Sequence, residues 1–437
     1  MINKLQEIFS IPELKRRVMF TLGLLIVYRI GSHITTPGVD ASVLTEFFAR
    51  QRGTILGLYD LFAGGNLEKA TIFALGIMPY ISASIILQLF QAVIPHFEKL
   101  AKEGEEGRKK ITQYTRYGTV VLSIVQGFGI AIFLESMTGP SGTNAVMFPG
   151  WGFRILTVIT LTAGTVFVMW LGEQITERGI GNGISLIITV GILARYPIDA
   201  LNTYRAVELG QMTPFKLVII ALMMVLIIAG VIFVTQGQRR VPVQYAKRVV
   251  GRRVYGGQAS HIPLSVNIAG VIPIIFAQSL IMFPGTIAAL FPNITILQSI
   301  SLWLSPGHVI YITLYSLIII FFTYFYTAIV LNPVDLADNM KKSGGFIPGI
   351  RPGKRTAEYI DRILTRITLP GAFFLAFIAV LPDLLITKAN VPFYFGGTGL
   401  LIVVGVMLDT LRQVESHLLM RHYEGFVKHG RLKGRRG

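Results

Sequence analysis

The chain has 437 residues, of which 52% are hydrophobic and only 14% charged, with a mean hydropathy of +0.61. Soluble domains carry about 25% charged residues, and disordered chains combine low hydrophobicity with high charge, so this composition excludes an ordinary cytosolic enzyme and a disordered protein. The absence of cysteine excludes disulfides, thiolate metal sites and thiol nucleophiles. The sequence therefore predicts a polytopic membrane protein with a net charge of +17.

Ten charge-poor stretches are candidates to cross a hydrocarbon layer of roughly 30 Å, which takes about 20 apolar residues. In chain order they are 18–34, 70–95, 117–134, 155–172, 180–194, 217–238, 266–290, 308–331, 367–382 and 389–408. The seventh and eighth come from one 81-residue stretch, 254–334, that carries no formal charge. The N-terminus has no cleavage site of the signal-peptide type, so we expect the first span to remain as an anchor.

The distribution of Lys and Arg between the predicted spans gives the orientation. The two termini and the loops on their side of the membrane hold 31 of the 40 basic residues, whereas the opposite loops hold eight. Because cytoplasmic loops carry the excess of basic residues, we expect both termini in the cytoplasm.

The loop between the sixth and seventh spans, 236–265, contains six cations and no acid. They are Arg239, Arg240, Lys247, Arg248, Arg252 and Arg253. Such a cluster can enforce topology and contact anionic lipid, or it can dock an anionic partner such as rRNA or an acidic protein surface. We favour docking because two or three cations suffice for topology.

The loop between the eighth and ninth spans, 332–366, has mixed charge. Its centre, 343–353, is too rich in Gly and Pro to be helical. It is either a structured hairpin that presents Arg351 or a flexible linker.

The segment 58–70, just before the second span, is short, amphipathic and rich in small residues. Gly64 and Gly65 form a possible hinge. The segment is either a surface helix or a stretch that folds back into the membrane domain, where irregular backbone is tolerated only inside protein or beside water.

Polar residues inside the spans are few. Ile77, Ile81, Ser84 and Gln88 share one helix face by their spacing, and an intramembrane Gln favours protein or water over lipid. Asn267 is a second such group. His417 and His422 give only a weak metal signal.

The sequence lacks P-loop, HExxH and GxSxG motifs, and Arg29 is the only charge well within a predicted span. Coupled transporters usually need ionisable groups there. From the residues alone, a channel, a secondary transporter of the inverted-repeat type and a passive membrane scaffold all stay open.

Six stretches resemble one family. They are IFALGIMPYISAS at 72–84, QYTRYG at 113–118, WLGEQITERGIGNGIS at 170–185, QRRVPVQYAKR at 238–248, FIPGIRPG at 346–353 and VPFYFGGT at 391–398. In this order they resemble the bacterial SecY family, the channel subunit of the Sec protein translocase. The resemblance covers essentially the whole chain.

The resemblance implies an all-α polytopic membrane protein of ten transmembrane helices, arranged as two inverted halves of five in a clamshell around a central pore. The halves would be 1–196 and 197–413, followed by a basic cytoplasmic tail, 414–437. The protein would be a channel and not an enzyme, conducting unfolded secretory polypeptides across the bacterial plasma membrane and releasing membrane segments laterally. We expect no cofactor and no metal.

The resemblance also implies site residues. The aliphatic pore ring would be Ile77, Ile81, Ile188, Ile275 and Ile402. The plug that closes the outer funnel would include Leu61, Phe62, Ala63, Gly64, Gly65, Asn66 and Leu67. The lateral gate would use Ser82, Gln88 and Asn267. Motor or ribosome docking would use the six cations of 236–265 together with Arg351 and Lys354.

Implied partners are the small membrane subunits SecE and SecG, the SecA motor ATPase, the ribosome, signal sequences, nascent polypeptides and anionic lipids. The driving force would come from the motor ATPase or the ribosome.

Overall fold

The structure is a computed structural model. It describes residues 11–50, 55–137, 144–210, 213–245, 248–250, 253–255, 259–290, 299, 302–305, 307–389 and 397–429. The chain divides into two compact units. Unit 1 comprises Met1–Asn202, Met282–Pro306 and Val406–Gly437, and unit 2 comprises Thr203–Ile281 and Gly307–Gly405. Helices α10 (Tyr196–Glu208), α12 (Ile272–Leu290) and α17 (Gly397–His429) each contain a boundary between the units.

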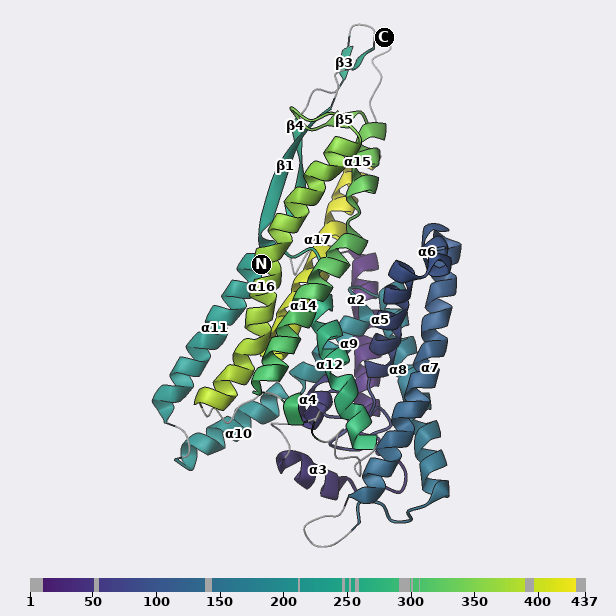
Figure 1. Cartoon of the computed structure of the whole chain (residues 1–437), viewed down its shortest axis with the longest axis vertical. Coiled ribbons are helices and arrows are strands. Elements are labelled where there is room, and N and C mark those ends of the chain that lie inside the picture. The colour runs from purple at the N-terminus through teal and green to yellow at the C-terminus, as the bar shows by residue number, and fades with distance from the viewer. Residues whose placement is uncertain are drawn as a thin grey trace. The chain divides into compact units, whose positions relative to one another are not determined.

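Unit 1 is helical from its first described residues. Its further helices are α2 (Pro12–Gly31), α3 (Ala41–Arg50), α4 (Ile55–Phe62), α5 (Met78–Val93), α6 (Pro95–Lys102), α7 (Glu105–Ser136), α8 (Trp151–Arg178) and α9 (Gly183–Leu193). The long helices α7 and α8 pack side by side (Figure 1).

The sequence of α7 explains why it packs so closely on its neighbours. Thr115, Thr119, Ser123 and Gly127 recur every four residues and are buried, and small side chains at this spacing let membrane helices approach closely. The opposite side exposes large apolar side chains such as Val121, 61% exposed, as expected of a helix that faces lipid.

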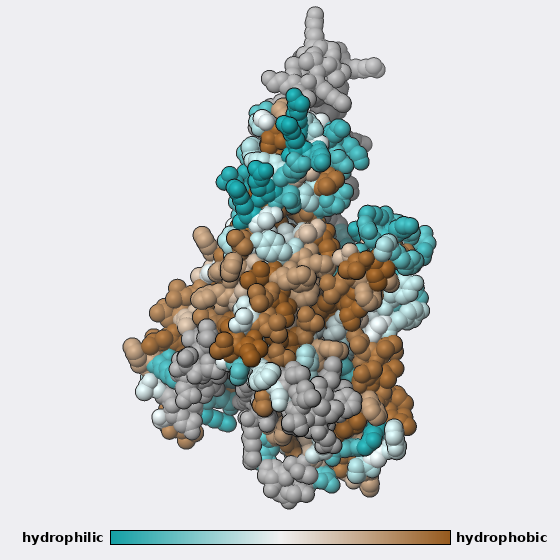
Figure 2. Space-filling view, in the orientation of Figure 1, coloured by the Kyte–Doolittle hydropathy of each residue, from teal (hydrophilic) through white to brown (hydrophobic). Residues whose placement is uncertain are grey.

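Unit 2 contains three long helices and two small sheets among its described residues. The helices are α11 (Pro214–Gln236), α14 (Val309–Val330) and α16 (Lys354–Ala389), with the short α15 (Pro333–Lys342) before α16. Helices α14 and α16 pack along each other (Figure 1). Figure 2 shows hydrophobic side chains over the bodies of these helices and hydrophilic ones over α15 and the strands.

The sheets were not predicted from the sequence. Strand β1 (Gln238–Tyr245) pairs antiparallel with β4 (Ala259–Ser265) and with β5 (Gly345–Phe346), and β2 (Arg248–Val250) pairs with β3 (Arg253–Tyr255). The buried side chains of the three-stranded sheet, β4-β1-β5, pack on α15 and α16 in one core. That core is Val241, Val243, Leu264, Met340, Ile347, Ile360 and Leu364.

The number of spans is only partly supported. Among the described residues, six helices are long and apolar enough to cross a membrane, or up to seven if the pair α5 and α6, bent by 98°, counts as one. This establishes a multi-pass membrane protein, and the count of ten remains a prediction.

Two span boundaries were wrong. The second predicted span begins at residue 70, but 70–77 form turns and α5 begins at Met78. The seventh begins at 266, but α12 begins at Ile272. Both stretches are apolar because they are buried in turns, which hydropathy does not distinguish from a buried helix.

Candidate functional site

The segment predicted to be a plug lies inside unit 1. Helix α4 ends at Phe62, and the chain continues in turns through residue 77. Every predicted plug residue except Gly65 is buried. The interpretation as a surface helix is therefore wrong, and the alternative, a stretch that folds back into the membrane domain, is confirmed.

Gly64 and Gly65 give this segment its shape. Both have left-handed backbones, with φ of +75° and +78°, a conformation that glycine adopts without steric cost. Their N–H groups donate to the carbonyls of Leu61 and Asp60 at 3.1 and 2.8 Å, which ends α4 as a C-terminal cap. A role for the pair as a hinge stays a prediction.

Three contacts hold the segment in unit 1. A Cβ at Gly64 would lie 2.8 Å from the Gly191 Cα of α9, so the two backbones touch. The Asn66 Nδ2 donates to the Tyr28 hydroxyl of α2 at 3.1 Å. The third contact is ionic: the Asp60 Oδ2 accepts from the Arg195 Nη1 at 2.7 Å.

Asp60 is only 1% exposed. Burial raises the pKa of the Asp60 carboxyl, and the neighbouring Arg195 guanidinium opposes that shift. The sequence does not predict this pair, because its members are 135 residues apart and no local pattern links them.

The turn at 179–183, before α9, joins three helices of unit 1. The Ile180 N–H donates to the Thr21 Oγ1 of α2 at 3.0 Å, and the Gly181 N–H donates to the Gln413 Oε1 of α17 at 2.9 Å. The Asn182 side chain accepts from the Ser185 N–H and caps α9. This glycine-rich stretch therefore positions α9, which contains Ile188.

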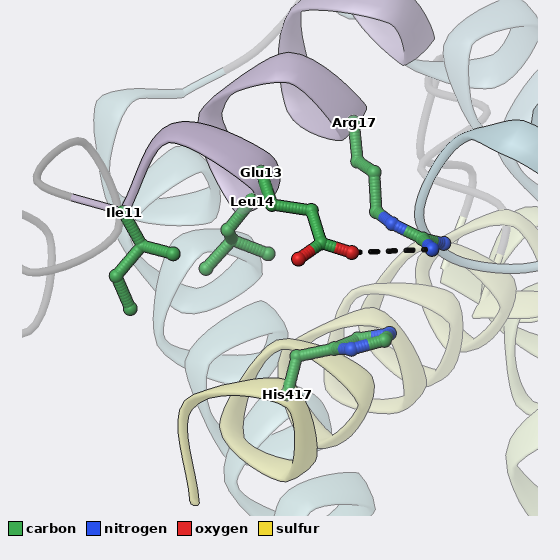
Figure 3. Close-up of a pocket in the computed structure, with 5 residues that line it drawn as sticks. All are labelled: Ile11, Glu13, Leu14, Arg17 and His417. Carbon is green, nitrogen blue, oxygen red and sulfur yellow. Dashed lines mark ion pairs between the residues drawn. The ribbon is translucent and has the colours of Figure 1, made fainter. Parts of the chain in front are cut away.

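The first turns of α2 lie beside α17 at a small pocket. Figure 3 shows the Glu13–Arg17 ion pair, 3.8 Å long, facing His417 of α17. Within the described part of the chain, no group of three or more His, Asp or Glu side chains could hold a metal ion.

The five predicted pore isoleucines are all buried. Ile77, Ile81 and Ile188 are 2–3% exposed and belong to unit 1, and Ile275 and Ile402 are 6% and 0% exposed and belong to unit 2. The Ile81 N–H donates to the Ile77 carbonyl at 3.1 Å, so these two lie one turn apart at the start of α5. The ring of five stays a prediction.

The three predicted gate residues differ in their surroundings. The Gln88 Nε2 donates to the Ser84 Oγ one turn away at 3.2 Å, and Ser82 also lies on α5. Asn267 is 5% exposed, and its Oδ1 has no hydrogen-bond partner among the described residues. A shared polar seam stays a prediction.

The predicted docking residues lie on or beside the sheet of unit 2. Arg239 and Arg240 are exposed on β1, and Arg351 and Lys354 are exposed where α16 begins. Arg248 and Arg253 belong to β2 and β3. Lys247 and Arg252 lie outside the described residues.

The Gly- and Pro-rich stretch before Arg351 is ordered. Its β5 pairs with β1, Ile347 is buried in the core of the sheet, and the Ile350 N–H donates to the Ile347 carbonyl at 3.0 Å. The interpretation as a flexible linker is therefore wrong. The stretch adds a strand to β1 and holds Arg351 at the surface.

The family model described as SecY matches residues 71–411. The chain belongs to the SecY family. It is 53% identical over 428 residues to the protein translocase subunit SecY of Escherichia coli K12, covering 97% of this chain and 96% of that one. The corresponding subunit of Thermus thermophilus is 46% identical over the full length of both chains.

Solved SecY-type structures share the fold. The structure described as a protein-conducting channel aligns with a TM-score of 0.67 over 93% of each chain at 17% identity. Sec61 in a canine ribosome–channel complex aligns with a TM-score of 0.63 over 93% of each chain at 16% identity. The resemblance seen in the sequence is thus confirmed, and the chain is a translocase subunit of the membrane rather than an enzyme.

Proposed function

We propose that this SecY-family chain forms the path by which unfolded secretory polypeptides cross the bacterial plasma membrane, and from which apolar segments leave laterally into lipid. The observation that carries the proposal is the 53% identity to a protein translocase subunit over 97% of the chain. The two inverted halves, 1–196 and 197–413, would open and close the path, with the basic tail 414–437 and both termini in the cytoplasm.

The buried isoleucines Ile77, Ile81, Ile188, Ile275 and Ile402 would form the narrowest part of this path. An apolar constriction resists wetting and therefore ion flow, yet it deforms around any passing side chain. A charged ring would instead select substrates by the sign of their charge. The plug residues 61–67 would close the outer side of the constriction.

The polar residues Ser82, Gln88 and Asn267 would hold the lateral gate shut. The Asn267 Oδ1 has no hydrogen-bond partner among the described residues, which supports this role, because a buried acceptor without a partner costs about 1–3 kcal/mol. A polar contact across the gate would recover that free energy, and an apolar signal sequence would have to displace it.

The cytoplasmic sheet would dock the ribosome and the SecA motor ATPase. Its packed core supports the exposed Arg239, Arg240 and Arg351, and exposed cations suit anionic partners. Structural relatives are described in complex with the ribosome. Lys247, Arg248, Arg252, Arg253 and Lys354 would extend this surface, and SecE, SecG and anionic lipids would complete the assembly.

The rival functions fit less well. A coupled transporter is expected to carry ionisable groups within its spans. A passive scaffold gives no reason for a segment such as 59–68 to be buried by specific polar contacts.

The test is the ion conductance of the resting protein, reconstituted in vesicles with its small subunits. Ile81→Ser should place a hydroxyl at the constriction, wet it and raise the leak at least about tenfold. Ile402→Ser should do the same. The matched control is Ile85→Ser, one turn further along α5 and 4% exposed, which should leave the leak unchanged. Unchanged conductance in both ring variants would remove the assigned constriction.

A further inference from the structure

Asp60 joins three points of unit 1. Its Oδ2 accepts from the guanidinium of Arg195, in the turn that follows α9, and its Oδ1 accepts from the Glu68 backbone N–H at 2.8 Å. The Glu68 carboxylate lies 3.8 Å from the Arg195 Nη2. One guanidinium therefore faces carboxylates from both ends of the segment 60–68.

These charges are shielded from water. The side chain of Asp60 is 2% exposed, that of Glu68 16% and that of Arg195 17%. A buried pair contributes little net stability, but removing one partner leaves an uncompensated charge. The cluster is thus better suited to fixing where the segment sits than to stabilising the fold.

We propose that Arg195 is the positioning residue that latches the segment 60–68 to α9, through Asp60 and Glu68. The latch deepens the proposed function, because it rests on the role of this segment as the closure of the path. To leave its place, the segment must separate both carboxylates from one guanidinium.

Water makes such a latch cooperative. While the cluster is dry, separating the charges is costly, because their attraction is weakly screened. Once water enters, both ions gain hydration and the cost of further separation falls. The segment is therefore held in one place or released, with no stable position between.

The test uses the absence of native cysteine. Leu67→Cys places a single thiol on the segment at a position 2% exposed. A membrane-impermeant maleimide added to the outer side of vesicles carrying the assembled complex then reports release of the segment as a rate of alkylation. The resting ion leak is measured on the same vesicles.

Arg195→Gln should raise the alkylation rate at least about tenfold, because it leaves the buried Asp60 carboxylate without a compensating cation. The double variant Asp60→Asn with Arg195→Gln should slow alkylation again, since it removes the most deeply buried unpaired charge and leaves only that of Glu68, whose side chain is 16% exposed. The matched control is Arg154→Gln, which breaks an equally close pair with Glu135 at 2.6 Å elsewhere in unit 1. It should change the rate less than about twofold.

The outcomes separate the latch from the proposed function. Faster alkylation together with a larger leak supports both. Faster alkylation with an unchanged leak supports the latch and contradicts the role of the segment as a closure. A rate equal to that of Arg154→Gln overturns the latch. If Arg195→Gln fails to fold, Arg195→Lys serves instead, and its rate should fall between the wild-type protein and the expected tenfold rise.

Discussion

The segment 60–68 of unit 1 and the three-stranded sheet of unit 2 satisfy their polar groups in opposite ways. In the segment 60–68, Asn66 is bonded to the Tyr28 hydroxyl of α2, and Asp60 to Arg195, which follows α9. On the sheet, Arg239 and Arg351 point their charge to the surface while the core beneath them is apolar. The polar groups of the first region are thus bonded within the protein, whereas the charges of the second are exposed and available to a partner.

This difference predicts how substitutions in each region behave. A change in the segment 60–68 should act in the resting complex and depend little on salt, because the contacts of this segment are buried. A change on the sheet should act only when a motor or ribosome is present and should be sensitive to salt, because exposed charges are screened within about 10 Å at 0.1 M.

Two glycine substitutions in the segment 60–68 should have the strongest consequences, and comparing them distinguishes overpacking from backbone strain. Gly64→Ala and Gly65→Ala both place a Cβ on a left-handed backbone, but only the Cβ at Gly64 meets another backbone, at 2.8 Å from Gly191 Cα. Overpacking of this kind costs about 1–3 kcal/mol beyond the shared strain. Gly64→Ala should raise the resting leak and lower the melting temperature well below that of Gly65→Ala. Equal effects of the two would show that the segment is not packed against α9.

A charge reversal at Arg351 tests whether the exposed cations beside the sheet of unit 2 dock a partner. Arg351→Glu should reduce motor-driven transport about tenfold, which corresponds to about 1.4 kcal/mol of docking free energy. Its melting temperature and resting leak should be unchanged, because the side chain is exposed. The matched control is Lys341→Glu, an exposed cation of α15 outside the docking set. Transport by Arg351→Glu that equals transport by Lys341→Glu would remove Arg351 from the docking surface.

The weakest change that we predict tests one hydrogen bond of the segment 60–68, the bond from Asn66 to the Tyr28 hydroxyl. Tyr28→Phe removes the hydroxyl that accepts from Asn66, but it keeps the ring stacked on Phe73 at 5.8 Å between centroids. One lost hydrogen bond is worth about 0.5–1.5 kcal/mol. The melting temperature should fall by a few degrees and the alkylation rate at residue 67 should rise severalfold. No change in either would mean that Asn66 does not help to fix the segment.

Much of the helical architecture follows from the sequence, because long charge-poor stretches are the main signal of membrane spans. The stretch 117–134 lies within α7 and 155–172 within α8. Both helices extend beyond the apolar stretch, because the length of an apolar stretch is set by the thickness of the hydrocarbon layer, and a helix can continue outside that layer.

The strand β1 has a signal in the sequence, whereas the contacts that fix the segment 60–68 have none. The alternation of exposed and buried residues around Val241 and Val243 is the period-two signal of a half-buried strand, and it marks β1. The pairing of Asp60 with Arg195 has no such signal, because only the fold brings the two residues together. The same holds for the contact of Gly64 with Gly191, since each glycine by itself also fits an ordinary turn or helix packing.

In the proposed function, a polypeptide in transit passes the isoleucines at the start of α5. We would place a single cysteine at Ile81 in the otherwise cysteine-free chain, assemble it with the proposed small subunits SecE and SecG, and add a secretory chain stalled in transit that carries one cysteine. We expect a disulfide between the two chains, and none with a cysteine at Val121, which is 61% exposed on α7. Efficient crosslinking at Val121 with none at Ile81 would show that the polypeptide does not pass the isoleucines at the start of α5.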